Sequence, residues 1–308
     1  MNATPRAAQQ PQANDGLTAA VAAYLLWGFM PLYFKWVVTV PALEMLAHRV
    51  VWAVPFGLAI VIVRRQLGEL VGILRKPSTL AWLCLSATVI ALNWITYILA
   101  VQREQVFQAS LGYYINPLMY VLVGVMFFGE RLGRPQWLAV LLAAAGVTVL
   151  TVSGGQVPWL ALGLAVSFTV YGVVRKQVAV GAMPGLLIET LLLAPLAVGY
   201  LYWLVSSEQL VFLNTATNQN IGLMLGGPLT VLPLLFFAVA ARRLTLSAIA
   251  FLQFMAPTIQ FLLGVYFGEP ITPATAICFA LIWCGVALFA WDALGRWRSA
   301  RQVPQNVR

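Results

Sequence analysis

Two proline-containing apolar segments carry polar side chains that could bind a solute. In the first segment, four residues are spaced i, i+3, i+4 and i+7: Tyr113, Asn116, Pro117 and Tyr120. A helix places these positions on one face, and hydroxyl and amide groups on that face are unfavourable against lipid. We therefore expect the face to point into the protein or into a water-filled space. Pro117 also lacks the N–H that would bond the carbonyl of Tyr113, which leaves a backbone acceptor free.

The second segment repeats this spacing with Gln253, Ala256, Pro257 and Gln260. Pro257 is expected to free the carbonyl of Gln253 in the same way. Matched interrupted helices near the middle of a membrane expose backbone dipoles, and transporters use them to bind a solute. In the alternative interpretation, both prolines shape helix packing and the amides bond neighbouring helices.

Glu44, His48 and Arg49 lie in one apolar segment, which contains the only histidine of the chain. Glu44 and His48 share a helical face, whereas Arg49 lies about 100° further round. Because charged groups inside a membrane are unfavourable without a partner, we expect Arg49 to meet Glu44, a carbonyl or an anionic group of a cargo. His48 either couples proton movement or serves as a hydrogen-bonded structural residue. Lys35 either completes this cluster or extends to the lipid headgroups.

Glu189, the counterpart of Glu44 in the second half of the chain, is a further candidate for the charge cluster or for coupling. Alternatively, Glu44 and Glu189 each stabilise the N-terminus of their own helix. The other candidate cavity residues are amide and aromatic side chains of further apolar segments: Trp27, Asn93, Tyr97, Tyr114 and Tyr171. The sequence contains no Walker-type run, no catalytic motif and no Cys/His cluster with metal-ligand spacing. We therefore predict no catalytic residue, no enzymatic activity, no cofactor and no metal site.

Membrane-spanning helices must position these residues. The chain of 308 residues is 61% hydrophobic and 9% charged, whereas a soluble domain is about 45–50% apolar and about 25% charged. Its long apolar runs match the roughly 20 residues that cross a bilayer as a helix. We predict an all-α integral membrane protein with ten spans: 17–37, 42–63, 80–101, 106–128, 135–152, 157–180, 185–205, 219–240, 245–267 and 273–293.

The two halves of the chain repeat each other. Equivalent residues recur in the same order: Gly28 and Gly172 (offset 144), Glu44 and Glu189 (145), Arg103 and Arg243 (140), Pro117 and Pro257 (140), Glu130 and Glu269 (139), and Gly146 and Gly285 (139). Each half has an odd number of spans, so the second half enters the membrane in the opposite orientation. We predict two inverted five-helix repeats at 17–152 and 157–293, with a disordered cytoplasmic tail at 1–16 and a basic cytoplasmic tail at 294–308.

The positive charges indicate the orientation in the membrane. With the N-terminus in the cytoplasm, 15 of the 18 Lys and Arg residues fall in cytoplasmic segments, in agreement with the positive-inside rule. The net charge of +9 is therefore a topology signal, and no nucleic-acid partner is expected. The expected partners are membrane lipids and a small-molecule substrate. Small residues at 143–146 permit close helix contact within one chain or in a homodimer.

Several motifs resemble one transporter family. FGER at 128–131 before QWLAV, AAAGV at 143–147 and YLLWGFMPLYFK at 24–35 resemble the EamA-type transporters of the drug/metabolite transporter superfamily. EMLAHRVVW at 44–52, ASLGYYINPL at 109–118 and GVVRK at 172–176 are similar to its RarD branch, which is named for chloramphenicol sensitivity. The resemblance implies a cavity built from spans 1 to 4 and 6 to 9, with spans 5 and 10 at the periphery.

We therefore expect a bacterial inner-membrane permease that exports or exchanges small metabolites or drugs by alternating access around a midplane cavity. The cationic side chains suggest a cargo with a carboxylate, such as an amino acid. The resemblance allows chloramphenicol-like compounds as well. Two other classes fit the sequence, namely a passive channel-like facilitator and a noncatalytic membrane scaffold or enzyme subunit.

Overall fold

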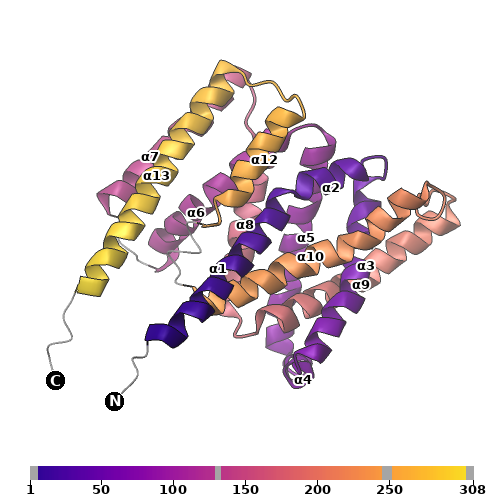
Figure 1. Ribbon diagram of the computed structural model, residues 1–308. Coiled ribbons are helices and arrows are strands. Elements are labelled where there is room, and N and C mark those ends of the chain that lie inside the picture. The colour runs from indigo at the N-terminus through magenta and orange to yellow at the C-terminus, as the bar shows by residue number, and fades with distance from the viewer. Residues whose placement is uncertain (1–5, 129–132, 245–251, 303–308) are drawn as a thin grey trace, which may run out of the picture.

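The structure, a computed structural model, describes residues 6–128, 133–244 and 252–302 (Figure 1). All regular secondary structure in these ranges is helical. The helices are α1 (Arg6–Gly28), α2 (Met30–Trp36), α3 (Ala42–Val63), α4 (Leu67–Leu74), α5 (Pro77–Gln102), α6 (Val106–Phe128), α7 (Arg134–Gly154), α8 (Trp159–Gln177), α9 (Ala182–Ser206), α10 (Thr217–Arg243), α12 (Met255–Tyr266) and α13 (Pro273–Gln302).

Within the described ranges, 8 helical stretches are long and apolar enough to cross a membrane: Asp15–Trp36, Ala42–Val63, Pro77–Gln102, Arg134–Gly154, Trp159–Gln177, Ala182–Ser206, Thr217–Ala240 and Pro273–Asp292. The prediction of an all-α membrane protein is therefore confirmed. The predicted span 106–128 is the 23-residue helix α6. The predicted span 245–267 contains the 12-residue apolar helix α12, and its first part, 245–251, lies outside the described residues, as does Glu130.

Helices extend into both predicted tails. α1 begins at Arg6, so the prediction of disorder is wrong for residues 6–16. α13 continues to Gln302, and the prediction of a basic cytoplasmic tail at 294–308 made no statement on its secondary structure. Residues 6–16 are rich in alanine and glutamine. Both residue types favour helix, so the helix continues beyond the apolar span.

The first predicted span is interrupted at Phe29, between α1 and α2. Pro31 lies in the first turn of α2 and lacks the N–H that would bond the carbonyl of Trp27. That carbonyl accepts a hydrogen bond from Gln260 Nε2 of α12 at 3.1 Å. The interruption thereby connects the first half of the chain to the second half.

Several contacts between two helices have an equivalent contact between their counterparts in the other half of the chain. α1 packs against α10 and α12, and α8 packs against α5 and α6. α3 packs against α10, and α9 packs against α5. The pairs α3 with α9, α6 with α12 and α7 with α13 each join one helix to its own counterpart.

Two glycines at equivalent positions of the two halves make equivalent contacts between α7 and α13. A methyl group on Gly146 of α7 would lie 3.0 Å from the carbonyl oxygen of Cys278 of α13, and one on Gly285 of α13 would lie 3.0 Å from that of Ala139 of α7. Each glycine thus lets the partner backbone approach closely. α7 and α13 lie side by side at one edge of the molecule, away from α3 and α9 (Figure 1), as the family resemblance implied for spans 5 and 10.

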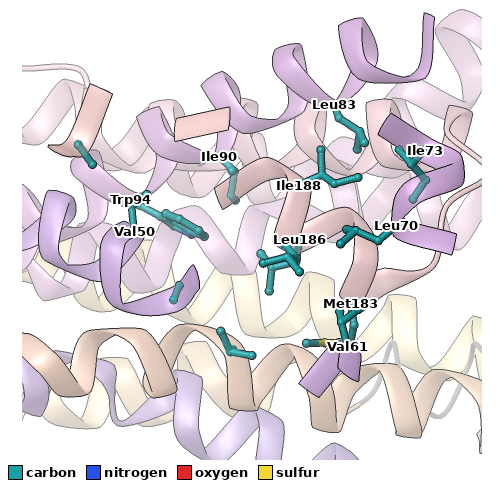
Figure 2. Packing of buried hydrophobic residues seen from close by; sticks show 14 of the residues in the cluster. Val50, Val61, Leu70, Ile73, Leu83, Ile90, Trp94, Met183, Leu186 and Ile188 are labelled. Carbon is teal, nitrogen blue, oxygen red and sulfur yellow. The ribbon is translucent and has the colours of Figure 1, made fainter. Parts of the chain in front are cut away.

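A buried apolar cluster joins α3, α4, α5 and α9 (Figure 2). Its members include Val50, Val61, Leu70, Ile73, Leu83, Ile90, Trp94, Met183, Leu186 and Ile188. Val50 of α3 and Trp94 of α5 both belong to this cluster. Because Val50 follows Arg49 in α3, this packing brings the Trp94 ring to the Arg49 side chain.

Candidate functional site

The polar face of α6 contacts α5 and α8. Tyr113 Oη donates to Asn93 Oδ1 at 3.3 Å, and Asn93 Nδ2 donates to Ser167 Oγ at 2.9 Å. Tyr120 Oη donates to the carbonyl of Phe168 at 3.1 Å. The structure thus brings Asn93 to the face of α6 that carries Tyr113 and Tyr120. These bonds fit the alternative in which polar groups join neighbouring helices.

The middle of α6 contains one unsatisfied polar group and one contact between the halves. Pro117 lies inside the helix, and the buried Asn116 Oδ1 has no hydrogen-bond partner within the described part of the chain. Tyr114 Oη lies 2.6 Å from Thr258 Oγ1 of α12. Because Thr258 donates its proton to the carbonyl of Phe254, Tyr114 is the donor in this pair. Tyr114 therefore bonds α6 of the first half to α12 of the second half.

The second polar stripe is not continuous. α12 begins two residues after Gln253, so the prediction that Gln253 and Gln260 share a helical face is wrong. Pro257 lies in the first turn of α12, where a missing N–H is tolerated, and the helix begins there for that reason. The carbonyl of Pro257 accepts a hydrogen bond from Ser110 Oγ at 2.7 Å. Gln260 is buried and donates to the carbonyl of Trp27, so Gln260 and Trp27 lie at the contact of α12 with α1.

Arg49 is buried among four other helices. Its Nε donates to Thr230 Oγ1 of α10 at 2.6 Å, and Thr230 in turn donates to the carbonyl of Gly226 at 2.7 Å. The guanidinium carbon lies 4.4 Å from the ring centroid of Trp94 on α5 and 5.8 Å from that of Phe34 on α2. Both distances are typical of cation–π contacts, which partly compensate for the loss of water. The hydroxyls of tyrosines on α2, α5 and α6 also lie within electrostatic range.

Glu44 and His48 face a different neighbour from Arg49. The fully buried Glu44 carboxylate accepts hydrogen bonds from the N–H groups of Val211 and Phe212, at 3.0 and 2.9 Å. His48 Nε2 lies 3.8 Å from Glu44 Oε1, and the His48 ring packs on Phe212 with centroids 4.5 Å apart. Of the three partners considered for Arg49, Glu44 is not one that it meets, because α3 directs Arg49 towards α10 and Glu44 towards the link between α9 and α10.

Lys35 does not join these residues. Its Nζ lies 3.0 Å from Glu104 Oε1, and the side chain of Glu104 is 76% exposed. The same Nζ lies 5.3 Å from the ring centroid of Phe267. Lys35 therefore belongs to an ion pair at the end of the helix bundle, and of its two alternatives the one in which it completes the cluster of Glu44, His48 and Arg49 is wrong.

A second buried cluster surrounds Glu189. Its carboxylate accepts hydrogen bonds from Ser86 Oγ at 2.6 Å and Tyr171 Oη at 3.4 Å, and it lies 3.7 Å from Arg175 Nε. The role predicted for Glu189 at the helix N-terminus is wrong, because the N–H of the residue that caps α9 is bonded by Glu69 instead. The sequence analysis missed Ser86 and Arg175, since only packing brings α5 and α8 to Glu189.

Glu269, the counterpart of Glu130 in the repeat, bonds the backbone of the other half. Its carboxylate accepts hydrogen bonds from the N–H groups of Val106 and Phe107, at 2.5 and 2.8 Å, at the start of α6. Burial raises the pKa of Glu269, and these two N–H groups and the charge of Lys35 act in the opposite direction. The motif therefore places a carboxylate of the second half on a helix N-terminus of the first half.

Several polar groups near Arg49 escaped the sequence analysis. Thr230 lies 181 residues away in an apolar run, and no local pattern marks it. Tyr33 Oη and the predicted Tyr97 Oη are buried without a hydrogen-bond partner among the described residues. A methyl group on Gly226 would lie 2.8 Å from Tyr33 Oη and 3.4 Å from Arg49 Cα, so this glycine lets both residues approach α10. Among the residues that the structure describes, no group of three or more His, Cys, Asp or Glu side chains is placed to hold a metal ion.

Comparisons with known proteins relate the chain to membrane transporters. The profile of the EamA-like transporter family matches residues 14–152. "Protein RarD" of Salmonella typhimurium is 44% identical over 284 residues, which cover 92% of this chain and 97% of that protein. "Uncharacterized transporter YojE" of Bacillus subtilis is 37% identical, with 95% and 98% covered. "Chloramphenicol-sensitive protein RarD" of Pseudomonas aeruginosa is 32% identical, with 96% and 98% covered.

A solved structure shares the fold. Its title is "Crystal structure of protein", it is 23% identical in sequence, and the TM-score is 0.61. The match covers 90% of this chain and 98% of the solved one. The helical arrangement over most of the chain is therefore one that an experimental structure also contains.

Proposed function

The chain belongs to the EamA-like transporter family, in the branch of proteins named RarD, and from this premise we propose that it is a secondary transporter of a small metabolite or drug. Two five-helix halves, residues 17–152 and 157–293, have opposite orientations in the membrane and move against each other. The solute binds between them. This family membership also supports a function in transport rather than catalysis.

The exchange of packing partners between the halves is the observation that carries this proposal. α1 meets α12 and α8 meets α6 through glycines at equivalent positions. A methyl group on Gly28 would meet Ile259 of α12, and one on Gly172 would meet Tyr120 of α6. A pseudo-two-fold axis relates such contacts, and inverted repeats have that axis in the plane of the membrane.

Polar contacts between the halves support a solute site at their junction. Several side-chain hydrogen bonds join helices of the first half to helices of the second half, among them Arg49 to Thr230, Tyr114 to Thr258, and Gln260 to the carbonyl of Trp27. Buried polar groups in a membrane protein are unfavourable against lipid and commonly mark a substrate path. Because these bonds join separate halves, they can break and re-form as the halves move.

The charge distribution supports a place in the bacterial inner membrane with both termini in the cytoplasm. Of the 18 Lys and Arg residues, 15 fall in segments that this orientation puts inside. The first turns of α1 and the last turns of α13 lie at the same end of the molecule (Figure 1). Anionic lipids of the inner leaflet are the expected partners of these basic segments.

Flux into proteoliposomes tests the proposal. Purified protein is reconstituted, and radiolabelled amino acids and chloramphenicol are offered with and without a pH gradient. Saturable uptake and counterflow against unlabelled solute are the expected results. Uptake that rises linearly without counterflow would indicate a passive channel. The absence of flux for every solute would favour a noncatalytic scaffold or enzyme subunit.

A further inference from the structure

We propose that Arg49 binds a carboxylate group of the transported solute, so that the cargo is an organic acid or an amino acid rather than a neutral molecule. The proposal rests on the transport function inferred above and specifies the substrate class of that site. It requires that Arg49 is charged, lacks a counter-ion and has free hydrogen-bond donors.

Arg49 is a buried charge without a counter-ion among the described residues. Its side chain is 6% exposed, and an arginine does not release its proton in a protein. Glu44, one turn before it on α3, is already bonded to the backbone of the α9–α10 link. Glu189, the other buried carboxylate of the described residues, is paired with Arg175. A buried charge with no opposite charge is strongly unfavourable, and the cation–π contact with Trp94 compensates for only part of it.

The free groups around Arg49 are hydrogen-bond donors. Its Nε bonds Thr230, whereas its two terminal NH₂ groups make no hydrogen bond or ion pair to any described residue. Within the part of the chain that the structure describes, the buried hydroxyls of Tyr33 and Tyr97 have no hydrogen-bond partner. Both hydroxyls, and that of Tyr113, lie within electrostatic range of the guanidinium. A carboxylate matches this set, because it accepts several hydrogen bonds and pairs with the two NH₂ groups of an arginine at once.

The binding group lies where the two halves meet. Arg49 and the tyrosines come from the first half, and Thr230 comes from α10 of the second half. Thr230 donates its only proton to the carbonyl of Gly226, so its oxygen must accept from Arg49 Nε. This arrangement fixes the plane of the guanidinium and leaves its NH₂ groups for a ligand. A ligand charge at Arg49 therefore acts directly on a contact between the halves.

Binding of acids and of the matching amides, which lack the carboxylate, to the full-length protein in nanodiscs tests the proposal. The probes are 3-phenylpropionate and 3-phenylpropionamide, butyrate and butyramide, and L-leucine and L-leucinamide. Each pair has nearly the same shape but differs in the carboxylate. We expect one or more acids to raise the unfolding temperature and to change tryptophan fluorescence, because Trp94 lies beside Arg49. The matching amide should do neither.

Four variants locate the effect. Arg49→Gln should weaken binding of the acid by about tenfold or more, the loss expected for a charged hydrogen bond. Arg49→Lys should restore part of it, since it keeps the charge but not the planar fork. Arg103→Gln removes an exposed arginine at the end of α5 and should leave binding unchanged. Trp94→Phe should remove the fluorescence change while the acid still raises the unfolding temperature.

The outcomes separate this proposal from the transport function. Acid-selective binding that Arg49→Gln abolishes supports the carboxylate site. No response to any acid, an equal response to acid and amide, or full binding by a folded Arg49→Gln protein would overturn it. Saturable flux of neutral amides through the wild-type protein would overturn the carboxylate site but leave the transporter. Acid-selective binding without saturable flux of any probe would support the site and overturn the transport function.

Discussion

Glu44 Oε1 lies 2.9 Å from the backbone nitrogen of Phe212, a residue 168 positions further along the chain. The bond joins the first turn of α3 to the link between α9 and α10. Glu269 makes the reverse connection, since its carboxylate accepts from Phe107 at 2.8 Å at the start of α6. Each half thus supplies at least one carboxylate to backbone N–H groups of the other half. When the two halves move relative to each other, these hydrogen bonds either break or keep the bonded segments together.

Replacing Glu44 by alanine is expected to destabilise the protein. The N–H groups of Val211 and Phe212 would lose a charged acceptor, and a hydrogen bond to a charged group contributes about 1.5–3 kcal/mol. Glu104→Gln is the matched control, because it removes a carboxylate whose side chain is 76% exposed, and such ion pairs contribute about 0–1 kcal/mol. Reversible unfolding in mixed micelles measures both variants. Equal losses of stability would show that the Glu44 connection contributes no more than a surface pair.

The sequence predicted the elements of the fold better than their contacts. The predicted spans 42–63 and 106–128 coincide with α3 and α6, because runs of apolar residues of membrane length are a local signal. The interruption at Phe29 was missed although Pro31 is visible in the sequence. A proline in a span removes one bond, but whether the helix breaks depends on a partner for the freed carbonyl, here Gln260.

The sequence named Arg49 and Tyr97 as candidates but not Thr230, which bonds Arg49 in the structure. The sequence placed Arg49 on a different part of α3 from Glu44 and His48, and the structure agrees with that difference. It did not identify the helix opposite each face, and the partner of Arg49, Thr230, lies in an apolar run with no local signal. The spacing of Gln253 and Gln260 predicted a shared face that does not form, since α12 begins after Gln253. Periodicity is informative only where the helix is continuous.

A double-mutant cycle tests whether the charges of Arg175 and Glu189 stabilise each other. Arg175→Met leaves the buried Glu189 carboxylate with only Ser86 and Tyr171 as partners. Removal of one member of a buried pair costs roughly 3–5 kcal/mol, and the low end applies here because the side chain of Arg175 is 16% exposed. The double variant Arg175→Met, Glu189→Gln removes both charges and should recover much of the loss. If the double variant is no more stable than Arg175→Met alone, the two charges are not coupled.

Gly226 tests the close approach of α10 to the first half. A methyl group there would lie 2.8 Å from Tyr33 Oη and 3.5 Å from Arg49 Cβ, so Gly226→Ala should push α10 away and cost about 1–3 kcal/mol. Gly199→Ala in α9 is the control, since nothing lies within 4 Å of the added methyl group. There alanine should be neutral or stabilising by about 0.5–1 kcal/mol. Thermal unfolding and flux in proteoliposomes measure both variants, and similar behaviour of the two would contradict the close contact.

Thr230 determines how the guanidinium of Arg49 is held, and a pair of substitutions isolates that role. Thr230→Val keeps the shape but removes the acceptor 2.6 Å from Arg49 Nε, so a charged hydrogen bond of about 1.5–3 kcal/mol is lost. Thr230→Ser keeps the hydroxyl, which can still donate to the Gly226 carbonyl and accept from Arg49. We expect Thr230→Val to lower both stability and the rate of saturable flux, and Thr230→Ser to restore both towards the wild type. Valine lacks the hydroxyl that accepts from Arg49, whereas serine keeps it. If the two variants have the same effect, the hydroxyl of Thr230 does not contribute to holding Arg49.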